Sequence, residues 1–376
     1  MSLQPETRPL DRRVVITALG MVQILAWGTS FYIPAVFAEP IVKDTGWSLG
    51  WVVGGISVGL LVAGLISPQV GKVIDVHGGR PVLLGIGMGT GLYDAVFAAL
   101  GRMYGSEARG PITNLTLFGG FASTVCWPLS AFMIEHIGWR NACFVYAALH
   151  LFLALPLVMS VIRPAPKAAA ASPAPADAMQ GALPARIPHE TLIFSLLALV
   201  LSLAAGIGSI VVVHLLIFLQ ARGVDFALAV SLGTLFGPAQ VGARVVEGLF
   251  GARYHPIWTM IACCMLMAAG LLLLSAKVGA LLLIILLYGA GYGISWIGRG
   301  TLPLALFGPI RFPRLMGKLA FPSLIVQALA PSAGALLIEA SGADATIGVL
   351  TILALINVLL IGLLWAVCRP LLSTSA

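Results

Sequence analysis

Eleven apolar runs, each about 20 residues long, constrain this chain more than any other feature. An α-helix rises 1.5 Å per residue, so a run of this length spans roughly 30 Å of hydrocarbon. Backbone polar groups in lipid must find partners within the segment, which favours helices. We therefore predict an all-α polytopic membrane protein. The runs are 14–36, 49–67, 81–100, 112–134, 142–161, 192–220, 226–249, 257–276, 279–298, 319–340 and 347–368.

Composition excludes several other classes of protein. Only 9% of the residues are charged and 59% are hydrophobic, whereas a soluble domain is roughly one quarter charged. The net charge of +7 does not indicate nucleic-acid binding, because the basic residues lie in short loops between apolar runs. The five cysteines fall within apolar runs and lack paired metal-binding spacing. We expect no metal and no cofactor.

The basic residues also predict the orientation. If successive loops alternate between sides, most of the 21 lysines and arginines fall on one side, and four (Lys43, Arg140, Arg222 and Lys277) fall on the other. Such an excess marks the cytoplasmic face. We therefore predict a multi-pass protein of the cell (inner) membrane with both termini in the cytoplasm. The polar N-terminus lacks the apolar core of a signal peptide.

An Ala- and Pro-rich segment, 163–189, is typical of a flexible linker, here predicted to be cytoplasmic. It separates an N-terminal helical bundle, 1–162 with five spans, from a C-terminal bundle, 190–376 with six. One span contradicts the charge pattern. Basic residues precede 81–100 and others follow it, and both groups belong on the same side, although a single crossing would separate them.

An internal repeat suggests an explanation. The sequence QVGKVIDVHGGR (69–80) resembles QVGARVVEGLFGAR (240–253), and GIGMG (85–89) resembles GAGYG (289–293). In the second half a complete span, 257–276, lies between the two motifs, whereas in the first half only four residues do. This comparison therefore predicts that the first half lacks its third helix. Restoring that helix gives twelve spans, six in each half, with every charged loop on its expected side.

The sequence GKVIDVHGGR resembles a motif of the major facilitator superfamily (MFS), which has the form Gly-x-x-x-Asp-x-x-Gly-Arg-Arg/Lys. Gly71, Asp75, Gly78 and Arg80 match it, and Gly79 departs from it. The GIGMG run, the sequence GWR (138–140) and the two-half organisation agree with this resemblance. It implies two bundles that rock about a central site by alternating access. It also implies a cavity lined by 14–36, 85–100, 192–220 and 279–298.

The resemblance implies secondary active transport of a small molecule, driven by a proton or substrate gradient. The alternative is a transport-inactive deletion variant, or a membrane-embedded relative that only binds or senses. We expect no enzyme, because polar residues are too sparse for a catalytic cluster and no ATP-binding motif is present. The predicted partners are a small-molecule substrate, protons and the lipid bilayer, with no nucleic acid.

Two charged residues within spans are the leading site candidates. A charge at the centre of a bilayer costs about 2.5–3.5 kcal/mol on insertion scales, so it needs a partner or a function. Asp94 and Arg299 occupy nearly matching positions in the repeat. We hypothesise that Asp94 is a proton or cation site and that Arg299 binds an anionic substrate or clamps Asp94. A structural ion pair, or charges facing cytoplasmic water, is the alternative.

Other candidates surround these two. His214 titrates near neutral pH and could relay protons, although a hydrogen-bonded core histidine is the simpler interpretation. The aromatic residues Trp27, Tyr32, Tyr93 and Trp296 suit a cavity wall, or ordinary packing. The two arginines within spans favour an organic anion such as a monocarboxylate, and the aromatic content leaves a hydrophobic substrate open.

The motif and its repeat predict a gate at the cytoplasmic end. We expect Asp75 to pair with Arg80 or to accept backbone donors of a neighbouring helix. Arg244 and Glu247 lie three residues apart and share a helix face, and a structural gate is favoured over substrate binding for them. The predicted gating residues are Gly71, Asp75, Gly78, Arg80, Arg244, Glu247 and Arg253.

Overall fold

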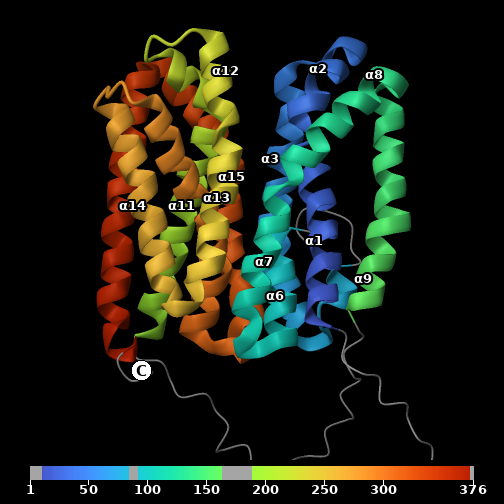
Figure 1. Ribbon diagram of the computed structural model, residues 1–376, viewed down its shortest axis with the longest axis vertical. Coiled ribbons are helices and arrows are strands. Elements are labelled where there is room, and N and C mark those ends of the chain that lie inside the picture. The colour runs from blue at the N-terminus through green and yellow to red at the C-terminus, as the bar shows by residue number, and fades with distance from the viewer. Residues whose placement is uncertain (1–10, 84–91, 163–188, 373–376) are drawn as a thin grey trace, which may run out of the picture.

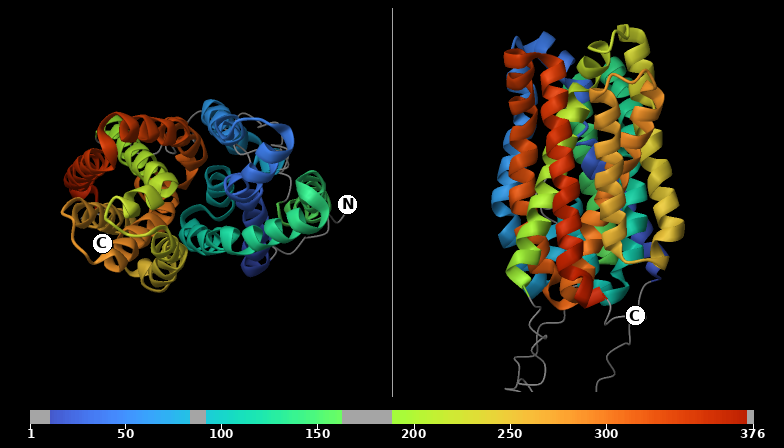
Figure 2. Two further views of the ribbon diagram at one scale, coloured as in Figure 1. Left: turned by 90° about the horizontal axis from the view of Figure 1, so that it is seen from above. Right: turned by 90° about the vertical axis from the view of Figure 1, so that its left-hand side faces the viewer.

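The computed structural model describes residues 11–83, 92–162 and 189–372. These residues are almost entirely helical and include no strand, as predicted for an all-α membrane protein. The helices stand side by side in two groups, one from each half of the chain (Figures 1 and 2). The GIGMG motif and most of the 163–189 linker lie outside the described residues. We use "lower end" for the end in Figure 1 that holds the start of α1 and the C-terminal end of the last helix.

The first crossing is a broken helix. Helix α1 (Arg12–Gly28) ends where Thr29 caps it, and α2 (Pro34–Thr45) begins at a proline. Between them, the Tyr32 amide donates to the Trp27 carbonyl over 3.0 Å. Proline lacks the amide proton that a continuing helix needs, so Pro34 favours a new start at this point. The sequence WGTSFYIP therefore forms a turn inside the molecule, with its aromatic side chains carried on the turn and the adjoining helix end.

Helix α3 (Leu49–His77) returns to the lower end. Ser48 caps its first turn, and Gly78 ends it with φ of 82°, a left-handed conformation that favours glycine. Later in the first half, α7 (Arg109–Gly120) and α8 (Ala122–Leu149) rise to the upper end, where Gly138 interrupts α8. The remainder of α8, the π-helix η2 (His150–Ala154) and α9 (Leu155–Val161) then descend.

The predicted single span 81–100 is wrong. The chain forms the short helix α4 (Arg80–Leu83) and then α6 (Tyr93–Tyr104), followed by η1 (Gly105–Ala108). Arg102, near the end of α6, donates to the carbonyls of Ile74 and Val76 in the last turn of α3. Leu92, just before α6, lies instead in the interior, beside Trp27.

Helix α6 is therefore a half-length element that begins inside the molecule and ends at the lower end. The start of α4 follows the end of α3 directly, so it also lies at the lower end. The chain enters and leaves this region on one side, and the basic residues before and after it stay together. This placement resolves the conflict between span length and charge.

The second half contains six traverses of the molecule. They begin with α11 (Glu190–Gln220), continue with α12 (Phe226–Thr234) and α13 (Phe236–Phe250), and pass through η3 (Gly251–Arg253) to α14 (Pro256–Ser275). The long helix α15 (Leu281–Leu372) is interrupted at Gly308 and Gly342, both with positive φ. These breaks divide α15 into a first segment (281–307), a second (309–341) and a third (343–372).

Six helical runs among the described residues are long and apolar enough to cross a membrane, judged by length and composition. Two of these runs hold more than one traverse, because the helix breaks at glycine 138, 308 or 342 are short. The runs are 50–77, 93–161, 190–220, 226–253, 256–275 and 281–370.

Ion pairs mark the two ends of the molecule. At the upper end Arg140 pairs with Asp44, and Arg222 and Lys277 share Asp344. At the lower end Arg12 pairs with Glu107, and Arg311 with Glu190. Arg140, Arg222 and Lys277 belong to the minority that the sequence placed on one side, and Lys43 lies in the last turn of α2 at the same end. Which end faces the cytoplasm stays a prediction.

The re-entrant placement of α6 predicts its topology. In a variant with the native cysteines replaced, Ser106→Cys should react with a membrane-impermeant maleimide from the same side as Ala170→Cys in the linker. Ala221→Cys, beyond the upper end of α11, should react from the opposite side. Labelling of Ser106→Cys together with Ala221→Cys, in intact cells or sealed inverted vesicles, would contradict this arrangement.

Candidate transport site

A buried ion pair joins the two halves of the molecule. Arg299 Nε lies 2.7 Å from Asp94 Oδ1, and Arg299 Nη2 lies 2.8 Å from Asp94 Oδ2. The Arg299 side chain is 6% exposed and that of Asp94 is 17% exposed. A two-point guanidinium–carboxylate contact is among the strongest pairings of side chains. Nη2 also donates to Ser323 Oγ over 2.7 Å, so the first and second segments of α15 both contribute.

The half-length helix explains why an acid is tolerated here. Asp94 lies in the first turn of α6, where unpaired backbone amides and the helix dipole favour negative charge. Because α6 begins in the interior, this favourable end lies inside the molecule. A continuous 81–100 helix would have placed Asp94 in the middle of a span, without that support.

Aromatic side chains surround the pair. The Trp27 ring centroid lies 4.9 Å from that of Tyr93, 5.2 Å from Trp296 and 5.5 Å from Phe31. The Arg299 guanidinium lies 5.7 Å from the Trp296 ring centroid. Tyr32 lies at the edge of this group, 6.2 Å from Trp27. The structure thus brings together the four aromatic residues that the sequence suggested as a cavity wall, and it adds Phe31.

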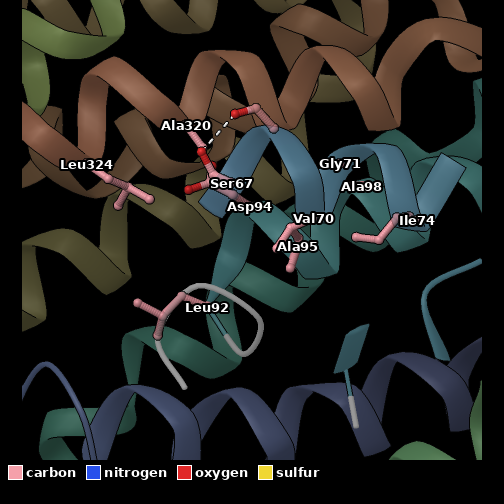
Figure 3. A pocket seen from close by; sticks show the side chains of 11 residues that line it. Ser67, Val70, Gly71, Ile74, Leu92, Asp94, Ala95, Ala98, Ala320 and Leu324 are labelled. Carbon is pink, nitrogen blue, oxygen red and sulfur yellow. Dashed lines mark hydrogen bonds between the residues drawn. The ribbon is translucent and has the colours of Figure 1, made fainter. Parts of the chain in front are cut away.

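Two small cavities adjoin Asp94. The larger, about 20 Å³, lies between α3, α6 and the second segment of α15, and Figure 3 shows Ser67, Asp94 and Leu324 on its wall. The smaller, about 10 Å³, is enclosed by the aromatic residues together with Gln327. A cavity must offer the centre of a water molecule roughly 10–15 Å³ to hold one. In this state the cavities have the size of one or two water molecules.

Arg244 and Glu247 do different things. Arg244 is 3% exposed and donates to the Thr116 carbonyl over 2.8 Å and to the Gly293 carbonyl over 2.9 Å. It thereby connects α13 to α7 in the other half. Glu247 accepts instead from Thr259 over 2.7 Å and from the Tyr254 hydroxyl, within its own half. The two residues lie three apart on one helix, but Arg244 bonds to the other half and Glu247 bonds within its own half.

The loop after α13 forms a further contact between the halves, which the sequence did not suggest. Arg109 donates to the Tyr254 carbonyl over 2.6 Å and to that of Gly251. Burial, together with the hydrogen bond to Glu247, raises the pKa of the Tyr254 hydroxyl to about 12. Tyr254 therefore stays protonated and donates to that carboxylate at physiological pH. Arg253, expected here from the motif repeat, stacks on Phe250.

The predicted pairing of Asp75 is corrected by the structure. Asp75 accepts from Arg314, at the start of the second segment of α15, and no ion pair with Arg80 is recorded among the described residues. Asp75 lies in the last turn of α3 and Arg80 begins α4, but the Asp75 carboxylate faces the second segment of α15. This contact connects α3 to the other half at the lower end.

Glycines allow α3 and α15 to cross closely beside that pair. A Cβ added to Gly71 would lie 2.7 Å from the Pro313 carbonyl oxygen, and one added to Gly317 would overlap the Ser67 carbonyl oxygen. Ser67 Oγ donates across the crossing to the Gly317 carbonyl over 2.9 Å. Gly71 was expected from the motif, whereas Ser67 and Gly317 had no signal in the sequence beyond their residue types.

His214 lies away from this group. It is 8% exposed, and its Nε2 lies 3.0 Å from the Pro331 carbonyl, which holds α11 against the second segment of α15. It lines neither of the two cavities beside Asp94. Among the residues that the structure describes, no group of three or more His, Cys, Asp or Glu side chains could hold a metal ion.

The contacts between the halves are unevenly distributed along the molecule. In the described part of the chain, every hydrogen bond or ion pair between halves lies at the level of Asp94 or nearer the lower end. In Figure 1 the two groups of helices stand apart at the upper end and meet at the lower end. The polar contacts between the halves therefore end at the level of the charge pair, whereas apolar packing of Leu60 and Ala63 against Leu324 and Ala328 continues above it.

Comparison with known proteins agrees on the architecture. A bacterial homologue of the iron transporter ferroportin, in an outward-facing state with soaked iron, superposes with a TM-score of 0.68 at 14% identity, over 93% of this chain and 98% of that one. The MFS transporter FucP in the outward conformation gives 0.64 at 13% identity, over 92% and 98%. The proton:xylose symporter XylE, bound to 6-bromo-6-deoxy-D-glucose, gives 0.63 at 11% identity, over 93% and 94%.

No protein-family model and no curated protein matches this sequence. The helices and the charge pair define a polytopic α-helical membrane protein built from two bundles that meet at a buried ion pair. Its fold is that of the major facilitator superfamily. At these identities the likeness concerns the fold alone.

Proposed function

We propose that this protein is a secondary active transporter that carries a small organic anion, such as a monocarboxylate, together with a proton by alternating access. One observation carries this proposal: the Asp94–Arg299 pair spans the two bundles at the upper limit of the hydrogen bonds and ion pairs that join them. A buried pair within lipid is costly to keep. Because each bundle supplies one partner, a relative movement of the bundles would change the distance between Asp94 and Arg299.

Charge balance suggests how the pair would couple proton and anion. With both side chains ionised, the pair is neutral and Arg299 has no free site for an anion. Protonation of Asp94 would leave Arg299 as an uncompensated buried cation, which favours binding of an anion. The loaded site, with one proton and one carboxylate, is neutral again. A neutral site is the form in which the bundles can close over the substrate at lowest electrostatic cost.

The wall around the pair fits this role. Trp27, Tyr93 and Trp296 offer apolar surface for the body of a small organic acid. The cavities have the size of water molecules in this state, so the substrate would enter as the aromatic side chains move apart. Of the proteins with the same fold, XylE is described as a proton:xylose symporter. If the lower end faces the cytoplasm, this structure is an outward-facing state.

The alternative is a relative that binds its ligand without transporting it. The half-length α6 favours this alternative, because the second half has two complete traverses, α14 and the first segment of α15, where the described part of the first half has only the short helices α4 and α6. Such a protein would keep the charge pair and the aromatic wall, but it would not carry a ligand across the membrane.

Counterflow in proteoliposomes tests the proposal. Vesicles loaded with unlabelled lactate, pyruvate or acetate are diluted into the same labelled acid, with protein-free vesicles as the control for passive permeation of the neutral acid. We expect saturable, protein-dependent exchange of at least one acid, and faster net uptake when the outside is acidic. Asp94→Asn should keep exchange but lose the acceleration by a proton gradient. Binding without exchange would support the alternative, and neither binding nor exchange would overturn the proposal.

A further inference from the structure

Gln327 carries a buried polar atom without a partner. It lies in the second segment of α15 and is 3% exposed, and its side-chain oxygen Oε1 has no hydrogen-bond partner in the structure. Buried polar side-chain atoms in native proteins are nearly always bonded, so an unpaired one calls for an explanation. Gln327 also lines the smaller cavity together with Asp94 and Trp296.

The surroundings of Gln327 are otherwise satisfied. Ser209 donates to its backbone carbonyl over 3.1 Å, which fixes the helix against α11. Arg299 is bonded to both Asp94 and Ser323. The unpaired oxygen is therefore a single acceptor beside a complete network, and no described side chain in the site supplies the missing donor.

The spacing along the helix relates Gln327 to the charge pair. Ser323, which accepts from Arg299, lies four residues before Gln327, and such positions face the same side of a helix at roughly 5–6 Å between Cβ atoms. A carboxylate that replaced Asp94 on Arg299 would thus present the group next to it toward Gln327. That group would meet an amide acceptor in a wall that, apart from Asp94, consists of aromatic and aliphatic residues.

We propose that Gln327 selects substrates that bear a hydroxyl group one or two carbons from the carboxylate, so that the transported anions are small hydroxy acids. This inference rests on the proposed function and specifies its substrate class. The hydroxyl donates to Gln327 Oε1 while the carboxylate binds Arg299. A hydroxyl fits better than an ammonium group, because a second cation in this small site would be repelled by Arg299. A site built to bond a hydroxyl disfavours analogues that lack one.

Pairs of acids that differ only in the hydroxyl test this assignment. Lactate is compared with propionate, and glycolate with acetate, both in exchange and in thermal stabilisation of the purified protein. We expect the wild-type protein to favour the hydroxy acid of each pair by about tenfold, the order of one hydrogen bond to a buried acceptor. Gln327→Met, of similar shape, should bind both acids of a pair equally.

Two further measurements separate selection from a structural role. Gln327→Met should keep or raise the melting temperature, because it removes an unpaired acceptor without removing a bond. Asn357→Leu is the matched control: Asn357 is also 3% exposed with an unpaired side-chain oxygen, but it contacts Cys264 and lines neither cavity. It should leave the preference for hydroxy acids unchanged.

The outcomes distinguish this inference from the function on which it rests. If wild-type protein carries both acids of a pair equally, or if Gln327→Met keeps the preference, then Gln327 does not select the hydroxyl and only this inference fails. If no carboxylate binds or exchanges, the proposed function fails and this inference fails with it.

Discussion

Gly317→Val is expected to prevent the lower end from closing. Any Cβ at this position would overlap the Ser67 carbonyl oxygen across the crossing of α3 and α15, and the obstructing atom belongs to the backbone. Overpacking of this kind costs about 1–3 kcal/mol. The cost applies only when the two helices are in contact, so the ratio of closed to open lower ends should fall roughly 5–150-fold. Transport should fall in proportion, because a carrier must close one side before it opens the other.

Spin labels at Lys72 and Lys318, exposed residues on the two crossing helices, would report this change. We expect the distance distribution between the labels to shift to longer values in Gly317→Val. Gly348→Val is the control, because a Cβ at Gly348 meets no atom within 4 Å. An unchanged distribution in Gly317→Val would mean that α3 and α15 can separate locally without opening the lower end.

The second prediction concerns the buried pair itself. Arg299→Met should lower the free energy of unfolding by about 3–5 kcal/mol, because it leaves the Asp94 carboxylate buried without its partner. Combining it with Asp94→Asn should restore most of that stability, since no unpaired charge then remains. The double variant should nevertheless lose proton-coupled transport. Thermal unfolding in detergent, with transport measured in vesicles, separates the two effects.

An exposed ion pair serves as the control for the Arg299→Met and Asp94→Asn variants. Arg140 and Asp44 pair at the upper end with side chains 60% and 45% exposed, and exposed pairs contribute little to stability. Arg140→Gln should therefore unfold close to the wild-type temperature. If Arg299→Met were as stable as Arg140→Gln, the central pair would have to be accessible to water, and the coupling role proposed for it would lose its physical basis.

Several features of the fold followed from local properties of the sequence. The apolar runs predicted helices, and the basic residues predicted which loops share an end. The internal repeat placed Asp94 and Arg299 at nearly matching positions in the two halves, and the structure pairs them. These inferences succeed because the cost of placing a residue in lipid depends mostly on that residue and its immediate neighbours.

The failure at 81–100 has a definite cause. Hydrophobic length distinguishes a segment that enters lipid or a protein interior from one that stays in water, but not a full crossing from a shorter element packed inside the protein. The basic residues on either side, such as Lys72 and Arg102, did signal the conflict, because placing a charge on the wrong side of a membrane is costly. The sequence therefore indicated that 81–100 is not an ordinary crossing. The contact of Arg102 with the end of α3 shows that α6 ends at the lower end.

By itself, the sequence determined that this chain is a helical membrane protein in two related halves. It also determined which loops lie at the same end of the molecule and which charged residues lie in apolar surroundings. Those properties depend on the transfer free energy of short segments. Tertiary structure decided that Asp75 contacts Arg314, that Arg244 reaches Thr116, and that Gln327 is left with an unpaired oxygen beside the charge pair. Such partners lie far apart in the chain, and they meet only because the crossing of packed helices brings particular faces together.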